Sequence, residues 1–281
     1  MHKNPTKSRF IIAAPICSVK PLSKAVTSIF KMFHKQIEAY NKKCQFFTGV
    51  NTFWVTLNNQ PIIKTINKIN QNRRAKCIST FDFSTLYTKI PHDKLLFVLN
   101  NLIDFCFDGG PSEFIAVTRF GAKWVDCPTS FNLSFNKHKV KEAVKFIMTN
   151  CYFTIGDKIF QQIIGIPMGS DPAPFFANLF LYFYESKWLR KLQRSDLRRA
   201  RSFVNVYRFI DDLIAMNDNK EFEGCFKEIY PVELELGKEN NGYKEASFLD
   251  LNIAIENKKF EISLYDKTDG FSICHLRHFT L

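Results

Sequence analysis

The apolar residues between positions 22 and 47 recur every three or four residues, which is the spacing of one face of an α-helix. A second helix is expected from Pro91 to about residue 105, because proline is favoured in the first turn of a helix. The same reasoning predicts helices over three later segments, namely residues 138–151, 174–193 and 219–229.

Short apolar runs predict strands elsewhere in the chain. The segments "RFIIA" (9–13) and "CISTFDF" (77–83) each read as one strand. Residues 151–165 and 247–266 alternate on both sides of a polar centre, which predicts two hairpins. Residues 108–136 are interpreted as a mixed loop. Because strands and helices follow one another without strict alternation, the pattern predicts an α+β fold.

The segment "VYRFIDDLIAM" (206–216) places two adjacent aspartates inside an apolar run. Aspartate is among the poorest strand formers, and carboxylates are rarely buried unless they are paired. A strand, a turn and a second strand would resolve this conflict, since Asp211 and Asp212 would then lie at the tip of a hairpin. An ordinary Asp-Asp turn without further function fits the same pattern.

Composition narrows the class of protein. The chain has 281 residues, 46% of them hydrophobic, which suits one large domain or two small ones. The net charge of +12 favours a polyanionic partner, nucleic acid before a membrane surface, although a generally basic surface is the simpler alternative. The 8 cysteines form no zinc-binding spacing, and the start of the chain does not resemble a signal peptide. We therefore expect a nuclear or cytoplasmic, intracellular protein that is not secreted and has no membrane partner.

A third carboxylate gives the aspartate pair a chemical interpretation. Asp82 ends the strand predicted at residues 77–83, in a setting like that of Asp211 and Asp212. If the three carboxylates are close in space, they repel one another unless a cation lies among them, and Mg²⁺ prefers oxygen ligands. Three aspartates could hold two such ions about 3.5–4 Å apart, the arrangement that stabilises phosphoryl transfer.

Four segments in order through the chain resemble the conserved blocks of reverse transcriptases. They are "FDFSTLYTKIPH" (81–92), "GIPMGSDPAPFFANLFL" (165–181), "YRFIDDLI" (207–214) and "SFLDLNI" (247–253). The likeness is greatest to the reverse transcriptases of Penelope-like retroelements, and "RFIIA" with "KPLSK" is similar to the end of their fingers region.

The resemblance implies the right-hand architecture of polymerases. It places a partial fingers region at residues 1–75 and a palm, an antiparallel sheet with packed helices, at residues 76–281. The thumb would be largely absent. Residues Phe248, Leu249 and Asp250 would begin a hairpin like the primer grip.

The resemblance also implies the metal ligands and their chemistry. Asp82 and Asp211 would bind two Mg²⁺ ions, which Mn²⁺ could replace, and the backbone carbonyl of Phe83 would add a ligand. Asp212 would lie nearby and be less essential. The bound ions would lower the pKa of a primer 3′-hydroxyl and neutralise the charge of a triphosphate.

Further residues match the nucleotide-binding positions of the family. Tyr87 would lie under the sugar of the incoming nucleotide and clash with a 2′-hydroxyl, which selects deoxynucleotides. Gly169 belongs to a loop that approaches the substrate, and Gln162 is a candidate contact to the template–nucleotide pair. Arg9 matches an arginine that contacts the triphosphate, with Lys3 or Lys7 as a companion charge. Each of these residues could instead have only a packing or surface role.

Two assignments concern basic residues. Lys238 could protonate the pyrophosphate leaving group, and Lys244 is the competing candidate. The basic run at residues 187–201 is either a solvated face or a contact to the backbone of the template–primer duplex. In the second interpretation the contacts come from Arg190, Lys191, Arg194, Arg198 and Arg199.

The sequence thus predicts the core of an RNA-directed DNA polymerase from a retrotransposable element. Its partners would be an RNA template, a DNA primer and dNTPs. A truncated, catalytically inactive remnant that still binds nucleic acid is the alternative. An RNA-directed RNA polymerase shares the palm chemistry, but Tyr87 and the sequence blocks argue against it.

Overall fold

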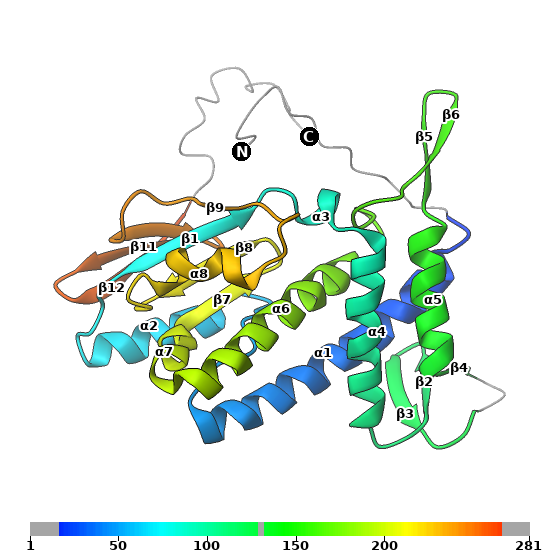
Figure 1. The fold of residues 1–281 in the computed structure, drawn as a ribbon, viewed down its shortest axis with the longest axis horizontal. Coiled ribbons are helices and arrows are strands. Elements are labelled where there is room, and N and C mark those ends of the chain that lie inside the picture. The colour runs from blue at the N-terminus through cyan, green and yellow to red at the C-terminus, as the bar shows by residue number, and fades with distance from the viewer. Residues whose placement is uncertain (1–16, 129–131, 266–281) are drawn as a thin grey trace, which may run out of the picture.

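The computed structural model describes residues 17–128 and 132–265, and it has an α+β architecture as the sequence predicts (Figure 1). Arg9, the strand predicted at residues 9–13 and the lysines Lys3 and Lys7 lie outside the described residues. No helix in the described part is both long enough and apolar enough to cross a bilayer.

Four long helices form the framework of the molecule, and all four match predicted helices. They are α1 (Lys20–Thr48), α4 (His92–Asp108), α5 (Lys137–Thr149) and α6 (Ala173–Ser195). The apolar stripe of α1 is buried against α4, α5 and α6, which explains why its apolar residues recur at helical spacing. It ends at Gly49, whose φ of 72° is a left-handed cap that glycine adopts without strain.

Shorter helices connect the other elements. The described residues contain α2 (Gln60–Gln71), α3 (Leu86–Lys89), α7 (Leu197–Ser202), α8 (Glu221–Ile229) and a 3₁₀ turn at Phe203–Asn205. Of these, α8 was predicted, whereas α2 was not.

A four-stranded antiparallel sheet lies at the centre, in the order β7-β8-β1-β9. Its strands are β1 (Ile78–Phe83), β7 (Val206–Phe209), β8 (Asp212–Met216) and β9 (Leu236–Lys238). The predicted strand, turn and strand are therefore confirmed, but the turn consists of Ile210 and Asp211, and Asp212 is the first residue of β8 rather than part of the tip. Side chains alternate between the two faces of a strand, so each face of this sheet needs its own cover.

The two faces of the central sheet are covered by different layers. Phe81 and Leu213 point into the larger core, which α1, α4, α6 and α8 build. Ile78 and Ile214 point to the other face, where they pack against α2 and a second antiparallel sheet. This second sheet has the order β10-β11-β12, with strands at Glu245–Phe248, Leu251–Glu256 and Lys259–Leu264, and it includes the predicted C-terminal hairpin.

The segment interpreted as a mixed loop, residues 108–136, is instead largely a three-stranded sheet. It contains β2 (Phe114–Thr118), β3 (Gly121–Val125) and β4 (Leu133–Asn136) in the order β3-β2-β4. The strands are short and only partly buried, so their apolar pattern is weak. Trp124 anchors β3 by packing edge-on against Phe107 at the end of α4. The two rings are 124 − 107 = 17 residues apart in the chain, so the local sequence pattern does not reveal their contact.

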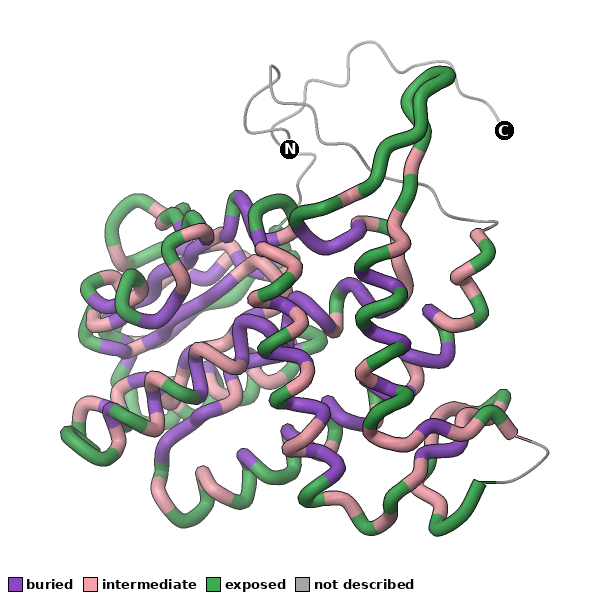
Figure 2. The backbone as a smooth tube through the Cα atoms, turned by 45° about the vertical axis from the view of Figure 1, so that its right-hand side comes forward, coloured by how far each residue is buried: buried purple, intermediate pink, exposed green. Residues whose placement is uncertain are grey.

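The predicted hairpin around Gly156 is confirmed as β5 (Tyr152–Ile155) and β6 (Lys158–Gln161). Its residues are almost all exposed, and the hairpin projects away from the packed layers (Figure 2). It leads directly into the loop that precedes α6.

Candidate active site

The strand register brings the aspartates of two distant sequence blocks together. In the pairing of β1 with β8, Asp82 lies directly opposite Asp212, so both side chains share one face of the sheet. The backbone N–H of Phe83 donates a hydrogen bond of 3.2 Å to the carbonyl oxygen of Asp211. The backbone positions of the three aspartates therefore lie at one end of the central sheet.

The aspartates lie on the face that the second sheet covers only in part. Side chains alternate between the two faces of a strand, so Ile78 and Asp82 of β1 both point to this face. Ile214 and Asp212 of β8 point to it as well. The isoleucines are buried, whereas Asp82 and Asp212 are only partly buried at the strand ends. This accounts for carboxylates inside an apolar run: the same face is core at one end of the strands and a candidate site at the other.

Arg208 supports the turn that carries Asp211, and sequence reasoning missed it. Its side chain is fully buried, and its Nε donates to Glu185 Oε1 over 2.6 Å and its Nη2 to Glu185 Oε2 over 3.1 Å. Two further bonds go to Asn178, and Nη1 donates to the carbonyl oxygen of Ile210 over 3.0 Å. These bonds use all five guanidinium donors.

The buried ion pair fixes an unusual backbone geometry. Ile210 has a φ of 55°, which a β-branched residue rarely adopts, and its carbonyl oxygen is held by Arg208. Tyr230 adds a hydrogen bond of 2.9 Å to Glu185. The signal in the sequence is a charged residue at an inward strand position, since Arg208 shares the face of buried Val206.

Tyr87 lies close to the aspartates on the short helix α3. Burial, together with the nearby Asp211 carboxylate, raises the pKa of Tyr87 to about 12, and Arg208 partly offsets this effect. The phenol therefore stays neutral at physiological pH. The ring is half-buried beside Asp211, which is compatible both with packing and with a role next to a bound sugar.

The loop before α6 is tied to the segment that follows Asp82. The N–H of Gly165 donates to the carbonyl of Ile90 over 2.8 Å, and that of Ile166 donates to the carbonyl of Tyr87 over 2.9 Å. A Cβ atom at Gly165 would lie 2.3 Å from the carbonyl oxygen of Tyr87, and the φ of Gly165 is 82°. Glycine is thus required here for both conformation and space.

Gln162 and Gly169 flank Gly165 in the sequence, one before it and one after it. The side chain of Gln162 donates to the carbonyl of Ile164 over 2.9 Å, so in this structure it braces its own loop. Gly169 has a φ of 99° and lines a cavity of about 180 Å³ together with Lys20 and Asp171, which form an ion pair of 3.0 Å.

The donor set at the aspartates fits a hard cation. Asp82 and Asp212 stand opposite each other on two adjacent strands, and carboxylate oxygens are ligands that Mg²⁺ prefers. Within residues 17–128 and 132–265, no three acidic, histidine or cysteine side chains are already gathered as a complete metal cage. Mg²⁺ is usually bound through one or two carboxylates plus water and substrate phosphates, so an incomplete protein cage suits it.

The structure does not bring Lys238 to the aspartates. Lys238 pairs with Phe81 across β9 and β1, so it points to the opposite face of the sheet from Asp82. Its Nζ lies 2.8 Å from Glu223 Oε2 and 3.6 Å from the ring centre of Tyr243. Lys238 and then Tyr243 lower the pKa of Glu223, which marks a structural ion pair. Lys244, the competing candidate, is exposed in the connection before β10.

The residues predicted as a primer grip form the turn between β10 and β11. Phe248 is buried in the core between α2 and the second sheet. Leu249 and Asp250 both have positive φ, at 45° and 63°, which makes a tight two-residue hairpin turn. The carbonyl of Leu249 accepts a hydrogen bond of 3.3 Å from Asn59, so the turn is fixed to the start of α2.

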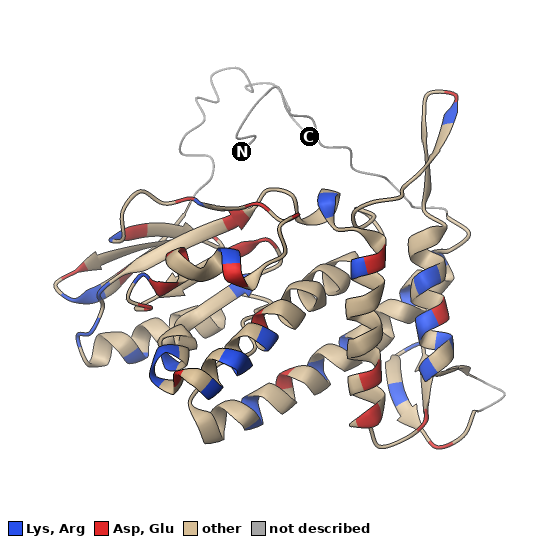
Figure 3. Ribbon diagram, in the orientation of Figure 1, with Lys and Arg blue, Asp and Glu red and all other residues tan. Residues whose placement is uncertain are grey.

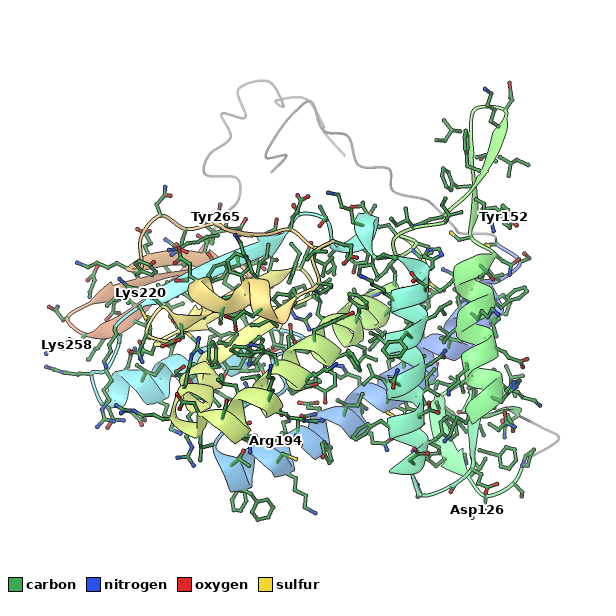
Figure 4. All side chains as sticks on the ribbon, viewed as in Figure 1. Asp126, Tyr152, Arg194, Lys220, Lys258 and Tyr265 are labelled. Atoms are coloured by element: carbon green, nitrogen blue, oxygen red, sulfur yellow. The ribbon has the colours of Figure 1, made fainter. Side chains whose placement is uncertain are left out.

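The basic run predicted to contact nucleic acid lies at the far end of α6 from the aspartates. Asn178, in the first half of the helix, and Glu185, near its middle, contact Arg208, whereas the basic residues follow in the last turns and in α7 (Figure 3). Lys191, Arg194 and Arg198 are exposed, and Arg194 projects from the helix surface (Figure 4). Arg199 pairs with Glu221 over 2.9 Å, and Arg190 lies over the ring of Tyr40.

The sequence and fold agree with one family. The model of the family described as reverse transcriptase (RNA-dependent DNA polymerase) matches residues 1–244, so the chain belongs to this family. No curated protein matches the chain in sequence.

Solved structures of telomerases have a similar fold. The telomerase of Candida albicans in complex with a TWJ fragment of telomeric RNA has a TM-score of 0.61 at 10% identity, over 87% of this chain and 40% of that one. Apo telomerase of Candida tropicalis without its C-terminal domain has a TM-score of 0.57 at 12% identity, over 85% of this chain and 45% of that one. The chain thus spans less than half of these proteins, and at such low identity the likeness concerns the fold alone.

Proposed function

We propose that this chain is the catalytic core of an RNA-directed DNA polymerase that adds dNTPs to the 3′-hydroxyl of a DNA primer on an RNA template. The register that sets Asp82 opposite Asp212, with Asp211 in the adjoining turn, is the observation that carries the proposal. In the reaction, the primer oxygen forms a bond to the α-phosphorus, the bond from that phosphorus to the bridging oxygen breaks, and pyrophosphate leaves.

Asp82 and Asp211 would hold two Mg²⁺ ions, with Asp212 beside them and the Phe83 carbonyl as a further ligand. These ions, when bound, supply acidification of the primer hydroxyl and neutralisation of phosphate charge. The protein residues act by position: Arg208 holds the turn, and the neutral Tyr87 faces the sugar and excludes a 2′-hydroxyl. Lys238 has no part in this mechanism, because its side chain is turned toward Glu223.

Primer extension tests this proposal. With Mg²⁺, an RNA template and dNTPs, Asp211→Asn should reduce product at least a hundredfold, whereas Asp157→Asn in the exposed hairpin turn should not. Equal product from Asp211→Asn and the unchanged protein would disprove intrinsic activity. In the same assay, Tyr87→Ala should gain incorporation of ribonucleotides, and no gain would remove Tyr87 as the selective residue.

We also propose that the enzyme derives from a retroelement of the Penelope-like kind and acts in the nucleus or cytoplasm. The sequence blocks around Asp82 and Asp211 support this origin. Sequencing the genomic flanks tests it, because an open frame that continues into a thumb and a nuclease region would support an element-encoded enzyme. A frame that continues into an unrelated host gene would contradict it.

A further inference from the structure

A groove of about 730 Å³ lies along the outer side of α6, between it and α4, with α8 at one end. It is lined by aromatic rings and cations together. Its rings include Phe105, Phe183 and Trp188, and its cations include Lys187, Lys191 and Arg194. Arg190 also lines it. This surface has no part in the proposed catalytic mechanism.

The cations of the groove form no ion pair with any residue that the structure describes. In the described ranges, no carboxylate lies within ion-pair distance of Lys187, Arg190, Lys191 or Arg194. This contrasts with Arg199 in the neighbouring α7, which pairs with Glu221. The groove also contains one acid, Glu228, and its carboxylate accepts a hydrogen bond of 3.4 Å from Trp188 Nε1. The groove therefore has an excess of positive charge.

The cations and rings are already arranged next to one another. Lys187 Nζ lies 5.9 Å from the ring centre of Phe183. The Arg190 guanidinium lies 5.6 Å from the ring of Tyr40, which in turn packs edge-on against Phe105 at 5.1 Å. Rings that stack on bases, set among cations that contact phosphates, are the features that bind single-stranded nucleic acid.

We propose that this groove binds single-stranded RNA, such as the unpaired part of a template. The choice of RNA rests on the proposed function, whereas the choice of a single strand rests on the rings and cations. A duplex hides its base faces within the stack, so it would leave the aromatic residues without a partner.

The groove is separate from the catalytic end. It lies on the side of the central sheet that packs on α6, whereas Asp82 and Asp212 alternate to the other side. Along α6, Arg194 follows Asn178 by 194 − 178 = 16 residues, or about 24 Å at the rise of a helix. A strand in the groove would thus leave the aspartates free for primer and nucleotide.

Binding of a fluorescently labelled single-stranded oligouridylate, followed by anisotropy, tests the charge contribution. Lys187→Gln/Lys191→Gln should weaken binding about tenfold and reduce the slope of log K against log salt by about 1.4, the value for two phosphate contacts. The control Lys139→Gln/Lys145→Gln removes two exposed lysines from α5 and should leave both quantities unchanged. Equal losses in the two double variants would overturn the proposal.

Stacking is tested in the same assay. Phe183→Leu should weaken binding about fivefold or more, whereas Phe146→Leu, at a ring that is 49% exposed on α5, should not. Thermal unfolding monitored by circular dichroism identifies any loss caused by misfolding. Equally effective competition by a duplex, or tighter binding of an oligothymidylate, would overturn the assignment to single-stranded RNA.

The test separates this proposal from the proposed function. If Asp211→Asn extends primers as well as the unchanged protein but the groove variants lose RNA, the groove stands and the catalytic proposal falls. Conversely, Lys187→Gln alone should extend a primer normally on a template whose unpaired part is only a few bases long. A comparable loss of extension there would overturn the separation of the two sites.

Discussion

Single residues next to the aspartates have little freedom to vary. Gly165 approaches the carbonyl oxygen of Tyr87 so closely that an added Cβ would lie 2.3 Å from it. Because Tyr87 follows Asp82 by five residues, this contact transmits the position of the loop before α6 to the candidate site. Gly165, the first residue of the sequence block at 165–181, is thus a point of rigid docking.

We expect Gly165→Ala to reduce the free energy of unfolding by about 2–4 kcal/mol, since left-handed strain and a backbone clash combine. The matched control is Gly156→Ala, where φ is also positive, at 59°, but no heavy atom lies within 4 Å. This control should cost about 1 kcal/mol, from strain alone. Urea unfolding of both variants measures the difference, and equal losses would show that the close approach has no energetic consequence.

Among the secondary-structure elements, α6 and the β7–β8 hairpin are joined by a buried ion pair rather than by apolar packing alone. Arg208 and Glu185 are both fully buried. Removing one partner of such a pair leaves an uncompensated buried charge. The pair also carries a positional role, because the same guanidinium holds the Ile210 carbonyl.

We expect Arg208→Met to lower the free energy of unfolding by about 3–5 kcal/mol. The double variant Arg208→Met/Glu185→Leu should recover much of this stability, because neither charge is then left unpaired. Primer extension by the double variant should nevertheless stay low, since the Ile210 carbonyl has lost its donor. Urea unfolding and primer extension, measured side by side, check both parts. Full activity of the double variant would contradict the positioning role.

The elements differ in how well the sequence predicts them. The strands around Asp82 and Asp211 were predicted because long apolar runs with a polar turn identify a hairpin locally. The sheet within residues 108–136 was not, because it is stabilised by contacts such as Trp124 with Phe107, which form only in the folded chain. The partners of Arg208 were missed for the same reason, since Glu185 lies 23 residues away on another element.

The candidate site shows the same division. The sequence blocks predicted which aspartates meet, and the register of β1 and β8 agrees. They could not reveal that Lys238 faces away from Asp82, because the face of a residue on β9 depends on the strand pairing. The division at residue 75 stays a prediction, although α1 shares the larger core with α4, α5 and α6.

At the scale of the whole molecule, one large core joins the N-terminal helix to the central sheet. His34 of α1 is buried in it, between Phe53 and Phe175, and its Nδ1 has no hydrogen-bond partner. Burial lowers the pKa of His34, Arg208 lowers it further, and Glu38 acts in the opposite direction. The folded protein therefore keeps this imidazole neutral under conditions in which the unfolded chain would protonate it.

The stability of the molecule should consequently fall in mild acid. A depressed pKa in the folded state gives a contribution that is fully present above the unfolded value of about 6.5 and is lost as pH falls toward the folded value. We expect His34→Leu to show a flatter decline of the urea midpoint between pH 7 and 5 than the unchanged protein. His138→Gln, at an exposed histidine, is the control. An identical pH profile for His34→Leu and the unchanged protein would contradict this expectation.

The pairing of Asp82 with Asp212 also has a consequence for insertions and deletions in the gene. Gaining or losing a single codon within β1 or β8 shifts the register by one residue and exchanges the two faces of that strand. The carboxylate would then enter the helical core while Phe81 or Leu213 left it. Such a change would disrupt the candidate site and the fold together. A variant that still folds has therefore kept the register of both strands, and with it the positions at which residues 82 and 212 face each other.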